Sequence, residues 1–134
     1  PPWPRFEGFQ QLYTIPVKAF EMAEDIIGPR WAKMGEGQQK MHARNMQEVL
    51  GPHLDAPSMF LLCYTRDGCD SEVTYTKTTG GTGSAIICAD RHDIPVINFH
   101  HTDWAEQLTI FSGVDFLDLK EEFRAYLEKE FATA

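Results

Sequence analysis

The chain has 134 residues, a size typical of one domain, and its 43% hydrophobic and 24% charged residues exclude a disordered, collagen-like or coiled-coil protein. Twelve basic against twenty acidic side chains give a net charge of −8, which argues against a broad nucleic-acid-binding face. The longest apolar runs, residues 59–63 and 85–89, are far shorter than the roughly 20 residues of a membrane-spanning helix.

The first predicted elements are a loop and two helices. Residues 1–13 are rich in proline, glycine and aromatic side chains without a period, which indicates a loop or arm. Pro16 suits a first helical turn, and Gly28-Pro29 ends the short helix that follows. Its apolar stripe is Phe20, Ala23, Ile26 and Ile27. A second helix is expected over residues 38–50 and ends at Gly51-Pro52.

Two continuous apolar runs of strand length follow, at residues 58–64 and 95–99. Because they lack alternation, we expect both faces of each strand to be covered, as in parallel sheets. Between them come a polar loop (65–79), a glycine loop (80–83) and a predicted helix (84–92). This order predicts a right-handed βαβ unit. A third strand is possible near residues 114–117.

The C-terminal part predicts two helices with acidic starts. Asp103 precedes Glu106 by three residues and Asp118 precedes Glu121 by three, so each pair resembles a capping box with Asp as the cap. The last helix keeps a 3.6-residue period through Leu119, Phe123, Tyr126, Leu127 and Phe131.

The glycine loop is the first candidate site and consists of Gly80, Gly81, Thr82, Gly83 and Ser84. Glycines let a phosphate approach the backbone, and the start of the next helix offers free N–H groups and a positive dipole end. The alternative is a plain tight turn. The position between a buried strand and a helix favours the phosphate site.

The motifs together carry a family resemblance. MHARN at 41–45, VLGP at 49–52, CYTRDG at 63–68, GGTGSAI at 80–86 and IPVINF at 94–99 resemble the phage and bacterial branch of a Rossmann-like superfamily. That superfamily joins DNA-processing protein A (DprA) with the "lonely guy" (LOG) nucleotide-binding proteins, and the resemblance covers residues 2–108. It implies an α/β fold with a Rossmann-like parallel sheet, flanking helices and a glycine loop that holds a nucleotide phosphate.

The sequence departs from that pattern in two places. The family's first glycine turn and its second Gly-Gly segment are absent, and residues 3–6 resemble what normally follows the third strand. The resemblance therefore implies that residues 1–134 are the C-terminal portion of a single Rossmann-like domain. We expect an incomplete three-layer sandwich whose sheet edge is covered by an N-terminal segment or by another chain, and a homo-oligomer. The hydrolase branch carries a Glu soon after the loop, whereas the next acid here is Asp90.

Further candidate ligand-binding residues lie outside the glycine loop. Arg44 could pair with a phosphate and Asn45 with a base or ribose, although the pair could also form a solvated helix face with Glu48. Thr65, Arg66 and Asp67 follow the carboxyl end of a predicted strand, where ligand contacts collect in open sheets.

Aromatic, histidine and cysteine residues complete the candidates. Tyr64 could stack on a base or pack in the core. His100 and His101 precede Asp103, but neighbouring strand residues point to opposite faces, so we expect no metal site.

Three cysteines without C-x-x-C spacing indicate a reducing compartment. We expect Cys63 and Cys88 to be inert packing and Cys69 to be an exposed thiol.

These observations predict a cytoplasmic protein that binds a nucleotide or nucleotide derivative at the glycine loop, with residues 65–79 as a mobile cover and no cofactor. Such a protein would act as a phage or bacterial regulatory or DNA-processing-like protein. One alternative is an N-glycosidic nucleotide hydrolase, for which Asp67, Asp70, Glu72 and Asp90 are the available carboxylates. Another is a structural module that has lost its ligand. Nucleic acid is a possible but less favoured partner, and no membrane is expected.

Overall fold

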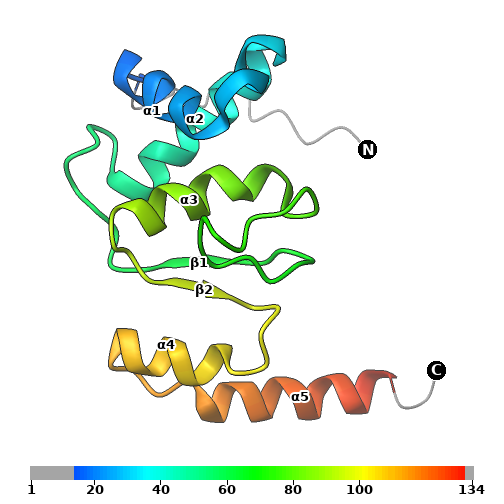
Figure 1. Cartoon of the computed structure of the whole chain (residues 1–134). Coiled ribbons are helices and arrows are strands. Elements are labelled where there is room, and N and C mark those ends of the chain that lie inside the picture. Colours follow the sequence, from blue (N-terminus) through cyan, green and yellow to red (C-terminus); the bar gives the residue numbers. More distant parts are fainter. Residues whose placement is uncertain (1–13, 132–134) are drawn as a thin grey trace, which may run out of the picture.

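The computed structural model describes residues 14–131, so the predicted arm at residues 1–13 lies outside the described residues. In the described part the chain is a mixed α/β protein in which helices predominate around a small parallel sheet (Figure 1). None of the helices between residues 14 and 131 is long and apolar enough to cross a membrane.

From residue 14 to residue 50 the chain forms the two helices predicted from the sequence, with a 3₁₀ helix between them. Helix α1 (Val17–Ile27) starts after Pro16, passes into a 3₁₀ helix η1 (Gly28–Lys33), and is followed by α2 (Glu36–Leu50). Gly28 and Gly51 end the two α-helices, each with a positive φ. The apolar faces of these helices pack on α3 (Gly83–Arg91). The main core is Ala19, Ala23, Trp31, Ala43, Met46, Val49, Leu50, Ala85, Cys88, Ala89 and Ile94.

Strands β1 (Leu61–Cys63) and β2 (Val96–Asn98) pair in parallel, with Leu62 opposite Ile97. The predicted βαβ order of strand, polar loop, glycine loop, helix and strand is therefore confirmed. The strands are shorter than expected. The backbone before β1 bonds to α2 instead, since the Ser58 N–H donates to the Val49 carbonyl at 2.9 Å.

The prediction that both faces of β1 are covered is wrong. Helix α3 covers one face of the sheet, and α4 (Trp104–Ser112) packs against β2 on the other (Figure 1). Leu62 therefore stays 43% exposed. The described residues contain two strands, so a full Rossmann-like three-layer sandwich is not observed among them.

The C-terminal segment folds as two helices without a third strand. Gly113 adopts a left-handed conformation that ends α4, and residues 114–116 form the turn into α5 (Leu117–Phe131). The strand prediction near residues 114–117 is thus wrong. Asp103 occupies the cap position of α4 without a side-chain bond. At the start of α5 the N–H of Leu117 donates to Asp115 Oδ1 at 2.9 Å, whereas the predicted cap Asp118 lies inside the first turn of the helix.

Candidate functional site

The glycine loop forms the 3₁₀ turn η2 (Gly80–Thr82) that leads directly into α3. Gly80 has a φ of +76°, which only glycine adopts without strain. A Cβ on Gly83 would lie 2.4 Å from Tyr75 Cε2. A Cβ on Gly81 would meet only the flexible end of Met41, at 3.1 Å. The backbone conformation therefore explains why residue 80 is a glycine, and the close packing of Tyr75 explains why residue 83 is one. Neither reason applies to Gly81, whose backbone lies at the surface.

Two side chains of α2 fasten the start of α3. His42 Nδ1 lies 2.7 Å from Ser84 Oγ, and Asn45 Nδ2 donates to the same oxygen at 2.9 Å. Asn45 Nδ2 also donates to the Gly81 carbonyl at 3.1 Å. Ser84 is 3% exposed, and burial, followed by the nearby charge of Arg30, lowers the pKa of His42. The predicted residues Asn45, Gly81 and Ser84 thus form one connected group.

Asp67 anchors the polar loop that precedes the glycines. Its Oδ2 accepts hydrogen bonds from the hydroxyls of Thr76 (2.6 Å) and Thr79 (2.5 Å), and its Oδ1 accepts the Cys69 N–H. The two threonine hydrogen bonds hold the pKa of Asp67 far below its ordinary range. Asp67 therefore ties the start of the predicted cover to its last residue, Thr79, immediately before the glycine loop, and both carboxylate oxygens already accept hydrogen bonds.

Thr65 belongs to a buried cluster of hydrogen-bonded polar groups at the carboxyl ends of the strands. Asn98 Nδ2 donates to Thr65 Oγ1 at 2.7 Å and to the Cys69 carbonyl at 2.8 Å, while Asn98 Oδ1 accepts from two backbone N–H groups. Asn98 is 1% exposed. Sequence reasoning did not single it out, although an amide at the end of an apolar strand signals a buried hydrogen-bond hub. Arg66, by contrast, is exposed.

A cavity of about 870 Å³ lies beside the glycine loop, between the end of α1, η1, α2, α3 and residues 72–77. Its lining includes Gly80, Gly81 and Ser84 of the predicted loop. The polar wall adds Arg30, Gln38, His42, Tyr75, Lys77 and Arg91. The apolar wall comprises Ile26, Ile27, Met34, Met41 and Ile87. The cavity therefore combines three features: the backbone at the start of a helix, cationic side chains and an apolar wall.

The cations of this cavity differ in what they already bind. Arg30 Nη2 donates to the Tyr75 hydroxyl at 3.2 Å. A guanidinium has five N–H donors, so this bond leaves the other donors of Arg30 for a ligand. Arg91 is held by Glu72 at 2.9 Å and by Asp25 at 3.0 Å. Lys77 is exposed and makes no hydrogen bond or ion pair with any residue from 14 to 131. Sequence reasoning missed all three, because they are far apart in the chain.

Some of the other predicted residues line two smaller hollows. One of about 400 Å³ is lined by Asn45, Gly81, Thr82 and Tyr64, together with β1. Tyr64 is 63% exposed, so its alternative role in core packing is wrong. The other hollow, of about 430 Å³, runs along α2 and includes Arg44 and Asn45.

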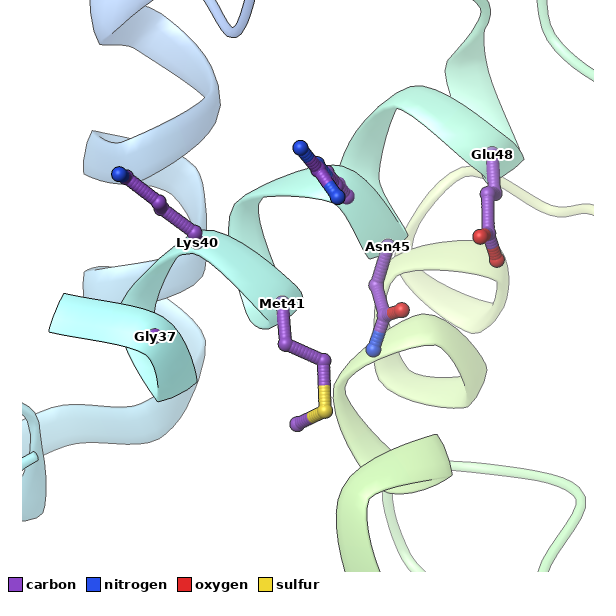
Figure 2. A pocket seen from close by; sticks show the side chains of 6 residues that line it. Gly37, Lys40, Met41, Asn45 and Glu48 are labelled. Carbon is purple, nitrogen blue, oxygen red and sulfur yellow. The ribbon is translucent and has the colours of Figure 1, made fainter. Parts of the chain in front are cut away.

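Figure 2 shows this second hollow, with the side chains of Lys40, Met41, Asn45 and Glu48 projecting from α2. Arg44 therefore shares a hollow with Asn45 but does not line the large cavity. Gly83, Thr65, Arg66 and Asp67 line none of the three hollows.

The predicted exposed thiol is wrong. Cys69 is fully buried, because its N–H bonds to Thr65 and Asp67 turn it inward, where it packs with Cys63 and Ile86. Burial raises the pKa values of Cys63 and Cys88 to about 11, as expected of inert packing.

The group considered as a metal site, His100, His101 and Asp103, is not gathered around a common point in the structure. Nε2 of His101 lies 2.7 Å from the Gly68 carbonyl and 3.7 Å from Asp70 Oδ2. Within residues 14–131 no three His, Cys, Asp or Glu side chains lie close enough to share a metal ion.

The carboxylates considered for catalysis each have protein partners. Glu72 pairs with Arg91, Asp90 accepts the Glu72 N–H at 2.9 Å, and Asp70 accepts the Thr74 hydroxyl at 3.2 Å. Of these carboxylates, Glu72 lines the large cavity.

Comparison with protein-family models, with curated proteins and with solved structures returned no match for this chain.

Proposed function

We propose that the protein binds a phosphate-bearing small molecule of the nucleotide class in the 870 Å³ cavity beside the glycine loop. The observation that carries the proposal is the junction of Gly80 and Gly81 with Arg30 and Lys77 in one cavity. Helix starts and cationic side chains favour the same ligand group, an anion.

The side chains that line the cavity carry a net positive charge, whereas the whole protein is negatively charged. The chain carries −8, yet the lining includes three cations, Arg30, Lys77 and Arg91, and one carboxylate, Glu72. Because Glu72 and Asp25 already neutralise Arg91, Lys77 and the remaining donors of Arg30 are the groups available to a phosphate. Gly81 offers backbone without a side chain on the same wall.

Size and apolar lining suit the rest of such a ligand. Pockets for small molecules and cofactors measure about 300–1,000 Å³ and combine apolar walls with a few polar groups. Ile87, Met34 and Met41 offer an apolar surface to a base, and Gln38 offers an amide for its polar edge. The Tyr75 ring beside Gly83 forms part of the same wall.

We also propose that the parallel β1–α3–β2 unit belongs to a Rossmann-like fold of the DprA and LOG type. The supporting observation is that β1 pairs with β2 on one side only among residues 14–131. Its other edge offers unpaired backbone groups that a further strand would satisfy. An N-terminal segment or another chain would supply that strand.

Isothermal titration calorimetry with nucleoside mono-, di- and cyclic phosphates tests the binding proposal. The matching nucleosides and inorganic phosphate serve as controls. We expect heat from at least one nucleotide, and weaker or no heat from its nucleoside, because the phosphate supplies the contacts to Lys77 and Gly81. Absence of heat from every nucleotide, with circular dichroism showing folded protein, overturns the proposal.

The same samples distinguish binding from N-glycosidic cleavage. Chromatography of AMP after incubation detects free base if a hydrolase is present. Three of the carboxylates considered for cleavage, Asp67, Asp90 and Glu72, are already engaged by protein groups, so we propose binding without cleavage. Release of base that Glu72→Gln abolishes would assign the hydrolase instead.

A further inference from the structure

Helix α5 is a second feature that the ligand cavity does not explain. It runs beside α4 at the edge of the molecule and extends past it (Figure 1). From Leu117 to Glu130 its residues are exposed, apart from a half-buried Lys120. Phe123 and Tyr126 are each 56% exposed, and Leu119 is 52% exposed. These side chains share one face of the helix with Leu127, at i, i+4, i+7 and i+8.

A helix of this length needs a packing partner on its apolar face. Isolated helices shorter than roughly 12–15 residues are marginal in water, and most of the stability of protein helices comes from burial of an amphipathic face. Within residues 14–131, α5 packs chiefly on α4. Ile110 and Phe111 at the end of α4 and Val114 in the next turn are exposed as well. The patch therefore spans both helices.

We propose that this patch binds a second copy of the chain, with α5 lying antiparallel to α5 of the other copy across a two-fold axis. The charges beside the apolar face support this choice of partner. Glu122 and Lys129 are seven residues apart, so they lie on the same flank of α5. When the two-fold axis crosses the helix pair midway between these residues, at the level of residues 125–126, Glu122 of each copy lies opposite Lys129 of the other.

This self-complementarity is what selects a second copy over an unrelated protein. Neither the Glu122 side chain nor the Lys129 side chain makes an ion pair or hydrogen bond with any residue from 14 to 131. Arg124 instead pairs within its own helix with Glu121 at 2.7 Å. A stable interface needs about 800 Å² from each partner. The 15-residue α5, about 22 Å long, and the end of α4 carry the exposed apolar side chains that such an interface would bury.

Sedimentation velocity over a range of protein concentrations tests the proposal. We expect the wild type to form dimers whose fraction rises with concentration, and Phe123→Glu to sediment as a monomer. Circular dichroism of Phe123→Glu shows whether α5 remains helical. A wild type that stays monomeric at every concentration overturns the proposal, as does a dimer that Phe123→Glu leaves intact.

Charge variants test the antiparallel arrangement without touching the apolar face. Glu122→Lys alone places like charges together, so we expect at least a tenfold weaker dimer. Combining it with Lys129→Glu restores the pairing and most of the affinity. Glu128→Lys makes the same charge change on the opposite face and leaves the dimer unchanged. Equal weakening by Glu122→Lys and Glu128→Lys, or no recovery in the double variant, contradicts the arrangement.

Discussion

His42 Nδ1 of α2 lies 2.7 Å from Ser84 Oγ of α3, and both residues are buried. This bond joins two helices that both line the large cavity, at the point where the glycine loop becomes a helix. Asn45 donates to the same oxygen, so the position of Gly81 depends on α2 as well as on its own turn.

Removal of the Ser84 hydroxyl should destabilise the fold. Ser84→Ala leaves His42 Nδ1 without its partner in a buried place, and such a loss costs roughly 1–3 kcal/mol of unfolding free energy. Urea denaturation followed by circular dichroism measures the change. Ser58→Ala is the control, because that hydroxyl bonds the Glu48 carbonyl at an exposed site and its loss should cost within about 0.5 kcal/mol. Equal effects of the two variants would contradict the role given to Ser84.

The pKa of His42 predicts how stability depends on pH. Burial, followed by Arg30, lowers this pKa from its ordinary value of 6.5, so the unfolded chain takes up a proton more readily than the folded one. The stability that neutral His42 contributes is present above pH 6.5 and is lost as the pH falls through its lowered pKa.

Urea titrations at a series of pH values between neutral and mildly acidic conditions test this dependence. We expect the wild type to lose unfolding free energy over the interval below pH 6.5, and His42→Gln to lose less over the same interval. An equal pH dependence in both proteins would show that other groups produce it.

Gly83 and Gly37 offer a matched pair of glycine substitutions within helices. Gly83→Ala places a Cβ 2.4 Å from Tyr75 Cε2, so the ring must move, at a cost of roughly 1–3 kcal/mol. A Cβ at Gly37 meets nothing within 4 Å, so Gly37→Ala should stabilise α2 by about 1 kcal/mol. Thermal unfolding of the two variants should therefore shift in opposite directions. A shift in the same direction would contradict the close packing of Tyr75 on Gly83.

Gly81 allows a carboxylate to be placed in the cavity without strain. Its φ lies outside the left-handed region, and a new Cβ meets only the movable end of Met41. We expect Gly81→Asp to stay folded and to lose at least tenfold in nucleotide affinity, because a negative charge would stand beside the phosphate. Calorimetry measures the loss, and Gly37→Ala is the folded control. Unchanged affinity would show that the glycine loop is not part of the nucleotide-binding site.

The sequence predicts the helical elements well, because their signals are local. Pro16, Gly28-Pro29 and Gly51-Pro52 mark helix limits through backbone chemistry, and the period of the last helix depends on its own residues. The strands were harder to predict. Residues 58–60 look like the start of a strand, but Ser58 bonds to the end of α2, which no local pattern encodes.

The candidate site was predictable in part for the same reason. The glycine loop is contiguous in sequence, and its position before a helix could be inferred. Arg30, Tyr75 and Lys77 reach the cavity from two distant segments, so the packing of η1 against the polar loop brings them together. Cys69 was misplaced because a polar neighbourhood in sequence suggested exposure, whereas its N–H bonds to Thr65 and Asp67 turn it inward.

The most direct test of the proposed site compares Lys77→Ala with Lys18→Ala. Both variants remove one exposed lysine, but Lys77 lines the cavity, whereas Lys18 lies on α1 and lines none of the three hollows. The measurement is the calorimetric dissociation constant for the tightest-binding nucleotide. We expect about tenfold weaker binding for Lys77→Ala, equivalent to about 1.4 kcal/mol, and no change for Lys18→Ala. Equal affinities of the two variants, or the same loss in both, would contradict a phosphate site in this cavity.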